Sequence, residues 1–291
     1  EKFSKIVKKI KPDLILIHGD RIESLACALV GSLNHILTAH IEGGEVSGNI
    51  DDTIRHAVTK LSHIHFVGNN KAKKRVLNMG EKRNSVFTIG SPDMDILLSR
   101  KLPSIKLVKK KYEIKFKNYS ILLWHPVTSK IYRLKKDTNK LINFVNEYNQ
   151  NFIVIYTNND PGARVIIDSY KKLLKTGKNK IFTNIRFENF ISLLKHSKFI
   201  IGNSSSGICE APVYGIPSVN IGTRQNKRFN CDSIIHLPEK SGKLLQVLKN
   251  LPKKKSPSLH FGKGNSAKLF SGILKKENFW KRSCQKTFRE I

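Results

Sequence analysis

The sequence predicts an α/β protein built from two doubly wound, Rossmann-like domains. Three observations lead to this prediction. Apolar runs of strand length alternate with segments of helical periodicity along most of the chain. The alternation comes in two series, separated by a lysine-rich stretch at residues 100–118. Polar residues follow directly after most of the apolar runs, as they do at the ligand-binding edge of an open parallel sheet.

The first series begins with the run DLILIH at residues 13–18, which predicts a buried strand. Apolar residues then recur at helical spacing through residues 21–33, which completes one β–α unit. Further strands are expected near residues 35–41, 64–67 and 85–89, and helices near 51–61 and 70–79, the last followed by Gly80 as a C-cap. These elements form a predicted first domain over residues 1–105.

The second series predicts a separate domain over residues 106–291. Its strands are expected at residues 120–126, 152–158, 180–184, 198–203 and 217–222, with helical segments between them. From about residue 239, the tail predicts two or three helices around the Pro- and Lys-rich loop NLPKKKSPS. Strands that alternate with helices favour a parallel sheet.

Composition excludes several classes of protein. The chain has 53 Lys and Arg against 22 Asp and Glu, but lysine is spread along the whole length and no recognisable nucleic-acid module accompanies it. We therefore expect a solvated basic surface and no nucleic-acid partner. No apolar run approaches about 18 residues, the start lacks a signal-peptide core, and the four cysteines lack metal-site spacing. We expect a cytoplasmic protein without membrane contact, disulfides or zinc.

The stretch HIEGGEVSGNIDD, residues 40–52, gathers four carboxylates in this basic chain. Glu42 ends a predicted strand and precedes two glycines, which allow a close approach of the backbone to a ligand. Asp51 or Asp52 has a structural alternative as the cap of the next helix, and so has Asp20 for the helix that starts at Arg21. Polar residues also end the other strands, so a ligand cleft between the edges of the two domains is expected.

The stretch IIGNSSSGICEAP, residues 200–212, predicts a phosphate site. Ser204 or Ser205 can cap a helix whose first N–H groups would hold an anion. Glu210 follows about one turn later, where a carboxylate can accept two ribose hydroxyls. Arg224, after the next strand, adds a fixed cation. The structural alternative is an ordinary helix cap with a surface glutamate.

Several motifs, in order along most of the chain, resemble the UDP-N-acetylglucosamine 2-epimerases of the hydrolysing branch. The non-hydrolysing branch has an HVEAG-type strand end and a Pro-Glu-Glu motif where this chain has HIEGGE and IDDTIRH. The motifs are HGDRIES (18–24), AHIEGGEVSGNIDDTIRHAVTKLSHIHF (39–66), IGSPDMD (89–95), WHPVTS (124–129), TNNDPG (157–162) and GNSSSGICEAPVYGIPSVNIGTRQNKR (202–228).

The resemblance implies the fold of the B-type glycosyltransferases, with UDP held by the C-terminal domain. It places Ser204, Ser205 and Ser206 at the diphosphate and Glu210 at the ribose. Arg224, Arg21 and Asn158 would lie near the nucleotide, and the segment NIRFENF (184–190) would occupy the place of the uracil-contacting loop.

The resemblance also implies a reaction. UDP is eliminated to give 2-acetamidoglucal, and water then adds to release N-acetylmannosamine for sialic-acid-type pathways. Asp20, Glu42, Asp51 and His125 fall at catalytic positions of the family. A UDP-sugar is the only partner implied, without cofactor or metal, and homo-oligomerisation stays open.

Three alternatives stay open from the sequence. In the first, the same 2-epimerase reaction acts on a UDP-2,4-diacetamido-6-deoxy sugar. In the second, the protein is a UDP-sugar glycosyltransferase of the same fold. Before DLILIH only one helix-like segment is present, so two or three β–α units of the N-terminal domain, on the order of 30 residues each, are expected to be missing. The third alternative is therefore an inactive fragment.

Overall fold

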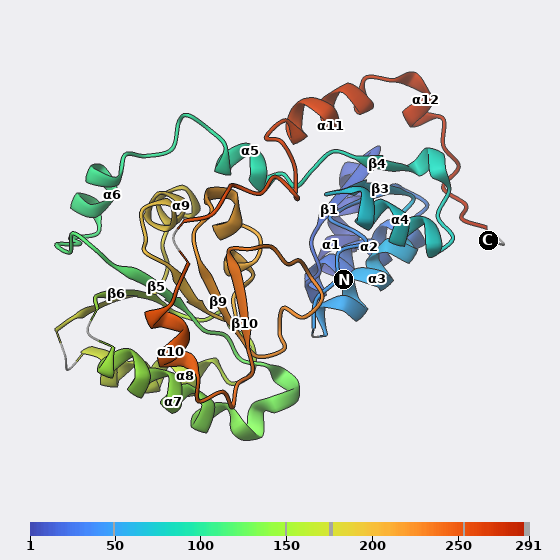
Figure 1. Cartoon of the computed structure of the whole chain (residues 1–291). Helices are drawn as coiled ribbons and strands as arrows, with labels where there is room; N and C mark the ends of the chain where they lie inside the picture. The colour runs from blue at the N-terminus through green and yellow to red at the C-terminus, as the bar shows by residue number, and fades with distance from the viewer. Residues whose placement is uncertain (49, 149, 175–176, 253, 288–291) are drawn as a thin grey trace. The chain divides into compact units, whose positions relative to one another are not determined.

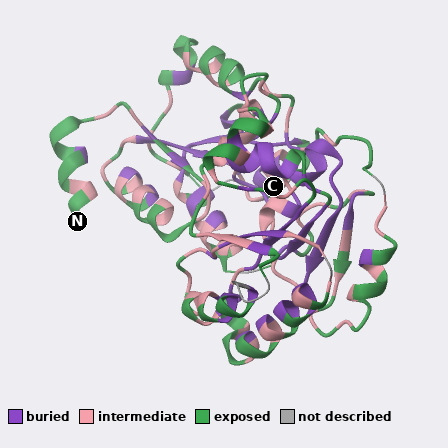
Figure 2. Ribbon diagram, turned by 90° about the vertical axis from the view of Figure 1, so that its left-hand side faces the viewer, coloured by how far each residue is buried: buried purple, intermediate pink, exposed green. Residues whose placement is uncertain are grey.

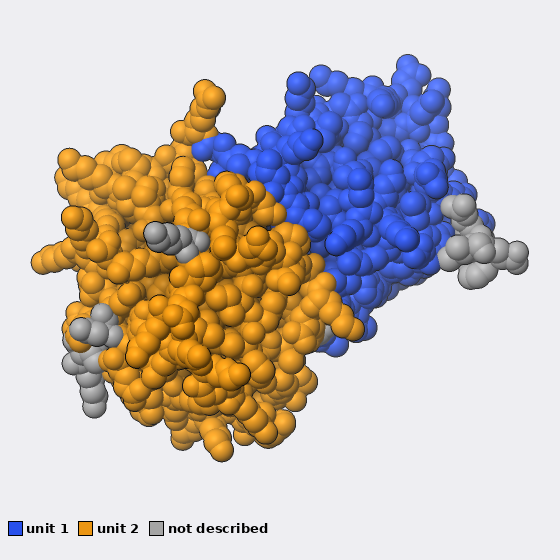
Figure 3. Space-filling view, in the orientation of Figure 1, with its two compact units in different colours: residues 1–46, 50–99, 259–291 blue, residues 47–49, 100–258 orange. Residues whose placement is uncertain are grey.

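The computed structural model describes residues 1–287 apart from residues 49, 149, 175–176 and 253. The chain forms two compact units, which Figure 3 distinguishes by colour. Unit 1 comprises residues 1–46, 50–99 and 259–291, and unit 2 comprises residues 47–49 and 100–258. We predicted that the whole of residues 106–291 forms the C-terminal domain; in the structure, the tail from residue 259 belongs to unit 1.

Unit 1 contains a parallel sheet of four strands in the order β1-β2-β3-β4 (Figure 1). The strands are Leu14–His18 (β1), Leu37–Ile41 (β2), Ile64–Val67 (β3) and Val86–Thr88 (β4). The helices are Lys2–Ile10 (α1), Ile22–Leu33 (α2), Asp51–Leu61 (α3), Asn70–Asn78 (α4), Asp93–Leu97 (α5), Ser266–Leu274 (α11) and Glu277–Trp280 (α12), with a 3-10 turn at Arg83–Ser85 (η1). The elements up to β4 lie where the sequence predicts them, with small differences at their ends.

Two apolar clusters cover the sheet of unit 1. In the first, Val7 of α1, Ala28 of α2 and Val58 of α3 pack with the β1 residues Ile15 and Ile17. In the second, residues of β2 and β3 pack with residues of α11 and α12. Both strands are therefore buried along their length, and Figure 2 shows buried residues concentrated in the strands.

Aromatic residues hold the tail against this sheet. The ring of Phe66, on β3, contacts those of Phe270 and Phe279, with centroids 4.8 and 6.4 Å away. Phe66 and Phe279 are buried. Aromatic side chains bury a large apolar area and therefore contribute strongly to the stability of a core. The tail from residue 259 therefore contributes side chains to the core of unit 1 although it follows unit 2 in the sequence.

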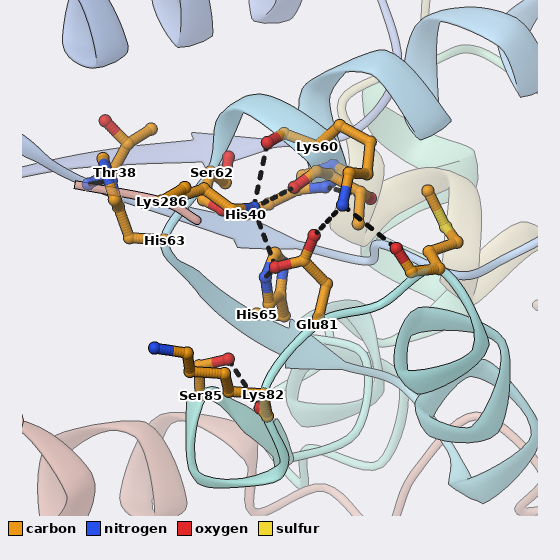
Figure 4. Close-up of polar contacts among 12 residues, drawn as sticks. Thr38, His40, Lys60, Ser62, His63, His65, Glu81, Lys82, Ser85 and Lys286 are labelled. Atoms are coloured by element: carbon orange, nitrogen blue, oxygen red, sulfur yellow. Dashed lines mark hydrogen bonds and ion pairs between the residues drawn. The ribbon is translucent and has the colours of Figure 1, made fainter. Parts of the chain in front are cut away.

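Lys286 fixes the end of the tail at the carboxyl end of α3 (Figure 4). Its ammonium group donates to the carbonyl oxygens of Thr59, Lys60 and Ser62 at 3.5, 2.9 and 2.6 Å. These carbonyls lie at the end of the helix, where a cation is favoured by the helix dipole. The helices of a parallel α/β sheet run opposite to the strands, so the carboxyl end of α3 lies at the edge where the strands begin. Lys286 therefore lies at this amino edge of the sheet.

Glu81 joins this amino-edge cluster. Its carboxylate accepts hydrogen bonds from Lys286 Nζ at 2.7 Å, Lys60 Nζ at 2.9 Å and His65 Nε2 at 2.9 Å (Figure 4). Only 3% of its side chain is exposed. Burial alone would raise the pKa of Glu81, but the hydrogen bonds from His65, Lys286 and Lys60 lower it to about 2.

Unit 2 contains a parallel sheet of six strands in the order β10-β9-β8-β5-β6-β7. The strands are Ser120–Leu123 (β5), Phe152–Ile155 (β6), Asn179–Phe182 (β7), Ile200–Gly202 (β8), Ser218–Ile221 (β9) and Ile234–Leu237 (β10). The helices are Ile105–Lys111 (α6), Leu134–Glu147 (α7), Ala163–Leu174 (α8), Phe187–Lys195 (α9) and Leu244–Lys249 (α10), and 3-10 turns occupy Thr128–Arg133 (η2), Ser205–Gly207 (η3) and Ala211–Tyr214 (η4). The sequence did not predict β10.

The strand order of unit 2 is that of a nucleotide-binding Rossmann sheet. Counted from β5, it reads 6-5-4-1-2-3, which is the same order as 3-2-1-4-5-6 seen from the other end. The chain reverses direction across the sheet between β5 and β8, the first and fourth strands. Ligands of such sheets bind beyond the carboxyl ends of the strands at this switch point.

The serine-rich turn after β8 differs from the prediction in one respect. Ser204 caps the following turn, because its hydroxyl accepts from the backbone N–H of Ser206 at 3.3 Å. The capped elements are the 3-10 turns η3 and η4, whereas we expected a regular helix with a strong dipole. Gly207, Pro212 and Gly215 lie within this short stretch, and both residue types disfavour α-helix.

Candidate functional site

Three strand ends of unit 1 bring polar side chains to Glu42. Glu42 follows β2, His18 ends β1, and Ser91 lies shortly after β4. The Glu42 carboxylate accepts from Ser91 Oγ at 2.5 Å through Oε1, and His18 Nε2 lies 3.2 Å from Oε2. The carboxyl edge of this sheet therefore gathers a carboxylate, an imidazole and a hydroxyl.

The backbone of Glu42 is in the left-handed region, with φ of 67°. Residues other than glycine seldom adopt this conformation, which has an energetic cost and is concentrated at functional sites. The Glu42 N–H donates to the carbonyl oxygen of Phe66 at 2.9 Å, so the neighbouring strand β3 holds the residue in place. The strained backbone directs the Glu42 side chain toward His18 and Ser91.

The charges around Glu42 change the proton affinities of its neighbours. The hydrogen bond with Glu42 raises the pKa of His18 despite the opposing effect of burial, and the charges of Asp93 and Asp20 act in the same direction. Burial, and then the charge of Glu42, raise the pKa of Asp93. Asp20, Glu42 and Asp93 thus surround one imidazole.

Asp20 and Asp52 pair with one guanidinium. Arg55, on α3, is 2% exposed and bonds to both carboxylates; its contact with Asp52 Oδ1 is 2.5 Å. It also donates to the carbonyl oxygen of Glu45 at 3.0 Å. Neither aspartate caps a helix, since the N-caps are Arg21 for α2 and Ile50 for α3, without side-chain cap bonds. The capping alternative for Asp20 and Asp52 is therefore not what the structure shows.

The other carboxylates of the stretch 40–52 have separate positions. Glu45 is 5% exposed and accepts from the Asn69 amide at 2.8 Å, which anchors the loop. Asp51 is the first residue of α3, directly after the cap residue Ile50. Of the four carboxylates predicted to cluster, Glu45 anchors the loop and Asp52 pairs with Arg55. Glu42 and Asp51 remain as candidates for a catalytic role.

A hollow of about 400 Å³ opens beside these residues in unit 1. His18, Gly19, Asp20, Arg21, Glu23 and Ser24 line it. Arg21 has a 60% exposed side chain, and its Nε lies 3.7 Å from Glu23 Oε2. A solvent-accessible space of this kind can hold a polar ligand against the carboxyl edge of the sheet.

In unit 2, Asn203 joins the two strand ends at the switch point. Its Oδ1 accepts from the backbone N–H of His125 at 2.7 Å, and its Nδ2 donates to the His125 carbonyl oxygen at 2.9 Å. The Asn203 carbonyl oxygen accepts from Arg224 at 3.3 Å and from Gln225 at 3.2 Å. Asn203 is 1% exposed. The buried Asn203 therefore holds the His125 backbone through its side-chain amide and Arg224 through its backbone carbonyl. The sequence singled out both His125 and Arg224.

Gly202 makes this junction possible. Its φ is 140°, and a Cβ there would lie 1.7 Å from the carbonyl oxygen of Leu123 on β5. Only glycine fits such an approach of two backbones.

His125 Nδ1 has two polar contacts in this structure. It accepts from the backbone N–H of Asn158 at 3.3 Å and lies 3.1 Å from Thr157 Oγ1. The bond from Asn158 favours the neutral tautomer with its proton on Nε2. Burial, and then the charge of Arg224, lower the pKa of His125 to about 3. Near pH 7 this residue offers an N–H group and no positive charge.

The remaining predicted residues of unit 2 lie in the loops after neighbouring strands. Asn158 follows β6 and donates to Asp160 Oδ2 at 2.5 Å. Ser204, Ser205 and Ser206 form the turn after β8. Glu210 is 8% exposed and precedes η4. The loops that hold His125, Asn158, the serines and Arg224 all leave the carboxyl edge of the sheet.

Sequence reasoning missed three contributors to the site. Arg55, Ser91 and Asn203 were not predicted as site residues. Ser91 and Asn203 were recognised only as residues that follow strands, and the signal for a role was that position. Arg55 lies three residues after Asp52, a spacing that allows a helical ion pair, but its bond to Asp20 spans 35 residues.

The described part of the chain lacks the features of a metal site and of a membrane-spanning helix. No group of three or more His, Cys, Asp and Glu side chains is arranged there to hold a metal ion. None of the described helices combines the length and apolar character of a membrane span.

Comparison with known proteins places these features in context. A family model described as UDP-N-acetylglucosamine 2-epimerase matches residues 1–275. A Neisseria meningitidis protein named UDP-N-acetylglucosamine 2-epimerase is 42% identical, and the match covers 99% of this chain and 78% of the relative. A Legionella pneumophila protein named UDP-N,N'-diacetylbacillosamine 2-epimerase (hydrolyzing) is 31% identical over 94% of this chain and 73% of the relative.

A solved structure agrees with the fold. The UDP-GlcNAc 2-epimerase of Methanocaldococcus jannaschii, in complex with UDP-GlcNAc and UDP, matches with a TM-score of 0.80 and 22% identity. The match covers 94% of this chain and 78% of that structure. The prediction of two Rossmann-like α/β domains of the B-type glycosyltransferase class is confirmed at the level of the fold.

Proposed function

The chain belongs to the UDP-N-acetylglucosamine 2-epimerase family, and we propose that it is a hydrolysing member of that family. In this proposal it converts UDP-N-acetylglucosamine and water into N-acetylmannosamine and UDP. Unit 2 binds the UDP part of the substrate, and the carboxylates of unit 1 act on the sugar.

The switch point of unit 2 supports the assignment of the nucleotide. His125 presents a neutral Nε2–H donor and Arg224 a permanent cation, both fixed by Asn203. Together with the backbone and hydroxyl donors of the turn Ser204–Ser206, they suit the charge of a diphosphate. Glu210 would accept the ribose hydroxyls, and Asn158 would lie near the nucleotide.

The carboxylates of unit 1 support the assignment of the sugar chemistry. Removal of the weakly acidic proton at C2 requires a base, and departure of UDP leaves positive charge at C1. Asp20, Glu42 and Asp51 supply negative charge for both needs, and Glu42 is held by two donors in a strained backbone. We assign Glu42 as the residue that exchanges a proton with C2.

The proposed reaction is balanced in two steps. In the first, the C2 proton moves to a carboxylate, the C1–O bond breaks with its electron pair going to the diphosphate, and a C1–C2 double bond forms. In the second, water adds its hydroxyl group to C1, and C2 receives a proton on the opposite face. The products are N-acetylmannosamine and UDP, and no oxidant, reductant or metal is consumed.

The hydrolysing mode rests on two observations. The strand end HIEGGE and the helix start IDDTIRH match the hydrolysing branch in type. The Legionella relative carries the word hydrolyzing in its name. In the alternative, non-hydrolysing mode, UDP would add back to the glucal and UDP-N-acetylmannosamine would be released.

Glu42 is the single observation that carries the proposal, because it joins a positive φ to two side-chain donors at the carboxyl edge. Incubation with UDP-N-acetylglucosamine in deuterium oxide should give free N-acetylmannosamine with deuterium at C2, together with UDP. Release of UDP-N-acetylmannosamine would contradict the hydrolysing mode. A product without deuterium at C2 would contradict elimination and favour glycosyl transfer.

The nucleotide site has its own test. Glu210→Ala should weaken UDP binding by roughly 1.5–3 kcal/mol, the usual contribution of hydrogen bonds to a charged group. Calorimetry with UDP measures this change. Lys240→Ala, in a loop of the same unit, serves as the control that also removes one charge. Equal UDP affinity in Glu210→Ala and wild type would refute the ribose assignment.

A second substrate is favoured by the Legionella relative, whose name specifies UDP-N,N'-diacetylbacillosamine. Parallel assays with the two UDP-sugars, compared by kcat/KM, decide between them. A ratio above about 100-fold in either direction identifies the substrate, because a pocket that reads one extra amide group discriminates by at least this factor.

A further inference from the structure

Glu42 is contacted from both sides at the carboxyl edge of unit 1. Ser91 reaches Oε1 and His18 reaches Oε2, and the two donors come from different strand ends. The N–H of Glu42 donates to the Phe66 carbonyl oxygen, and the Glu42 backbone has a positive φ, so the backbone that carries the carboxylate is fixed. With both oxygens also engaged, one orientation of the carboxylate is selected.

The direction of the Ser91 bond follows from its other contact. The backbone N–H of Asp93 donates to Ser91 Oγ at 3.3 Å, so this oxygen already acts as an acceptor. Its own proton is then directed to Glu42, since an ionised carboxylate can only accept. Ser91 is therefore a donor whose charge does not change with pH.

The tail of the chain holds Ser91 in place. The Ser91 N–H donates to the Phe261 carbonyl oxygen at 2.6 Å, and the side chain is buried. Gly90 and Gly262 pass so closely that a Cβ on Gly90 would lie 3.1 Å from the Gly262 Cα. The position of the hydroxyl is thus fixed by packing.

His18 is a donor of a different kind, because it is 47% exposed and titratable. The acidic groups that act on it are Glu42, Asp93 and Asp20. When the imidazole is protonated, its charge stabilises the Glu42 carboxylate and lowers its basicity. When it is neutral, the Nε2–H tautomer still donates, and Glu42 is the stronger base.

We propose that Ser91 and His18 are positioning residues that hold the Glu42 carboxylate in the orientation needed to exchange a proton with the substrate. The inference rests on the proposed function, in which Glu42 acts at C2 of the sugar. Ser91 supplies a permanent donor and His18 a titratable one. Misplacement of a reacting group by about 1 Å costs on the order of 10²-fold in rate.

The test compares variants of the two donors under the hydrolysing assay. Ser91→Ala should lower kcat on the order of 10²-fold, by the same factor at every pH from 6 to 9, with UDP affinity within twofold of wild type. Ser91→Thr keeps the hydroxyl and should recover at least a tenth of the wild-type kcat. Ser85→Ala is the matched control: Ser85 is equally buried in unit 1, and its hydroxyl donates to the Lys82 carbonyl oxygen at the amino edge.

His18→Gln keeps a neutral donor and removes the titration. It should lower kcat less than Ser91→Ala does, because its amide can still donate to Glu42, while the acidic limb of the kcat/KM profile shifts or disappears. Because His18 is partly exposed, this variant stays informative even where Ser91→Ala is too unstable to assay. An unchanged acidic limb in His18→Gln overturns the role of His18.

The outcomes separate this inference from the proposed function. If Glu42→Gln abolishes turnover while folded Ser91→Ala keeps kcat within twofold, the positioning role of Ser91 fails and the function of Glu42 stands. If Ser91→Thr is folded and as slow as Ser91→Ala, the hydroxyl is not the group that matters. If Glu42→Gln is fully active, Glu42 is not the group that exchanges a proton at C2 and the positioning role fails with it, whereas the hydrolysing activity itself stands.

Discussion

Two glutamates at opposite edges of the unit 1 sheet have opposite surroundings. Glu42, at the carboxyl edge, has a 24% exposed side chain, contacts with a hydroxyl and an imidazole, and a strained backbone. Glu81, at the amino edge, is 3% exposed and accepts from two lysines and a histidine. The difference is in exposure and in the charge of the donors.

These surroundings favour different roles. The carboxylate of Glu81 is buried and paired with cationic donors, so it connects α3, β3 and the tail. Glu42 lies beside the hollow at the carboxyl edge, near three other titratable groups. The same chemical group therefore serves packing at one edge and, in our proposal, reactivity at the other.

Glu42→Gln gives the largest expected effect in this comparison. The substitution keeps size and hydrogen bonding but removes the base, so kcat should fall about 10²–10⁴-fold. UDP affinity and the melting temperature should stay near the wild-type values, because the carboxylate is partly exposed. Steady-state kinetics and calorimetry measure the two quantities. A Glu42→Gln enzyme that melts early and keeps its kcat would reverse the comparison.

Glu81→Gln should show the opposite pattern. Loss of the charge leaves Lys60, Lys286 and His65 without their anion, and the free energy of unfolding should fall by about 3 kcal/mol, the low end for a broken buried pair because both lysines reach solvent. Denaturant unfolding measures this loss. Glu277→Gln, which breaks the exposed pair with Lys281, is the control and should change stability by less than about 0.5 kcal/mol. Equal stability of the two variants would contradict the structural role.

The pH dependence of stability should also distinguish the amino-edge cluster. Folding lowers the pKa of Glu81 from 4.5 to about 2, so the unfolded chain binds this proton more tightly and acid favours unfolding. The contribution of Glu81 is complete above pH 4.5 and is lost as pH falls toward 2. Burial also lowers the pKa of His65, so the unfolded chain binds a proton at this residue more tightly than the folded chain does. His65 therefore begins to disfavour folding below about pH 6.5. Unfolding measured between pH 7 and 3 should show this decline, and Glu81→Gln should flatten its lower part.

The smallest expected effect concerns the two histidines that contact these glutamates. Contact with Glu42 raises the pKa of the half-exposed His18, whereas burial lowers that of His65 despite its bond to Glu81. NMR titration of the ring protons should place the two midpoints on opposite sides of 6.5. Glu42→Gln should bring the midpoint of His18 down. Coincident midpoints would show that exposure does not separate the two sites.

The sequence predicted much of the fold because its strands are short apolar runs bounded by polar residues. It did not predict β10, whose apolar run of four residues includes His236. Nor did it show the destination of the tail, because the contacts of Phe270 and Phe279 with Phe66 join residues about 200 positions apart and leave no local pattern. We predicted an α-helix where the 3-10 turns follow β8, because a serine such as Ser204 can cap either kind of helix.

The candidate site was predictable only in part. Glu42 is recognisable from its apolar strand and the following glycines, and His125 from its place after β5. The bonds from Ser91 to Glu42 and from Arg55 to Asp20 depend on which strands become neighbours. Asn203 lies inside a motif that the sequence analysis identified, but its side chain forms hydrogen bonds with the backbone of His125, 78 residues away. Such long-range pairs require the three-dimensional structure.

The discontinuity of unit 1 has a consequence for synthesis on the ribosome. The residues of β1 to β4 emerge before residues 100–258 of unit 2, but the aromatic side chains that cover β3 and the lysine that binds Glu81 emerge only after them. Domains usually fold in the order in which they are made. Here the sheet of unit 1 keeps an apolar face uncovered while unit 2 is made, and unit 2 can finish folding before it. The nascent chain therefore has its greatest need of a chaperone at the uncovered sheet of unit 1 while unit 2 is being made.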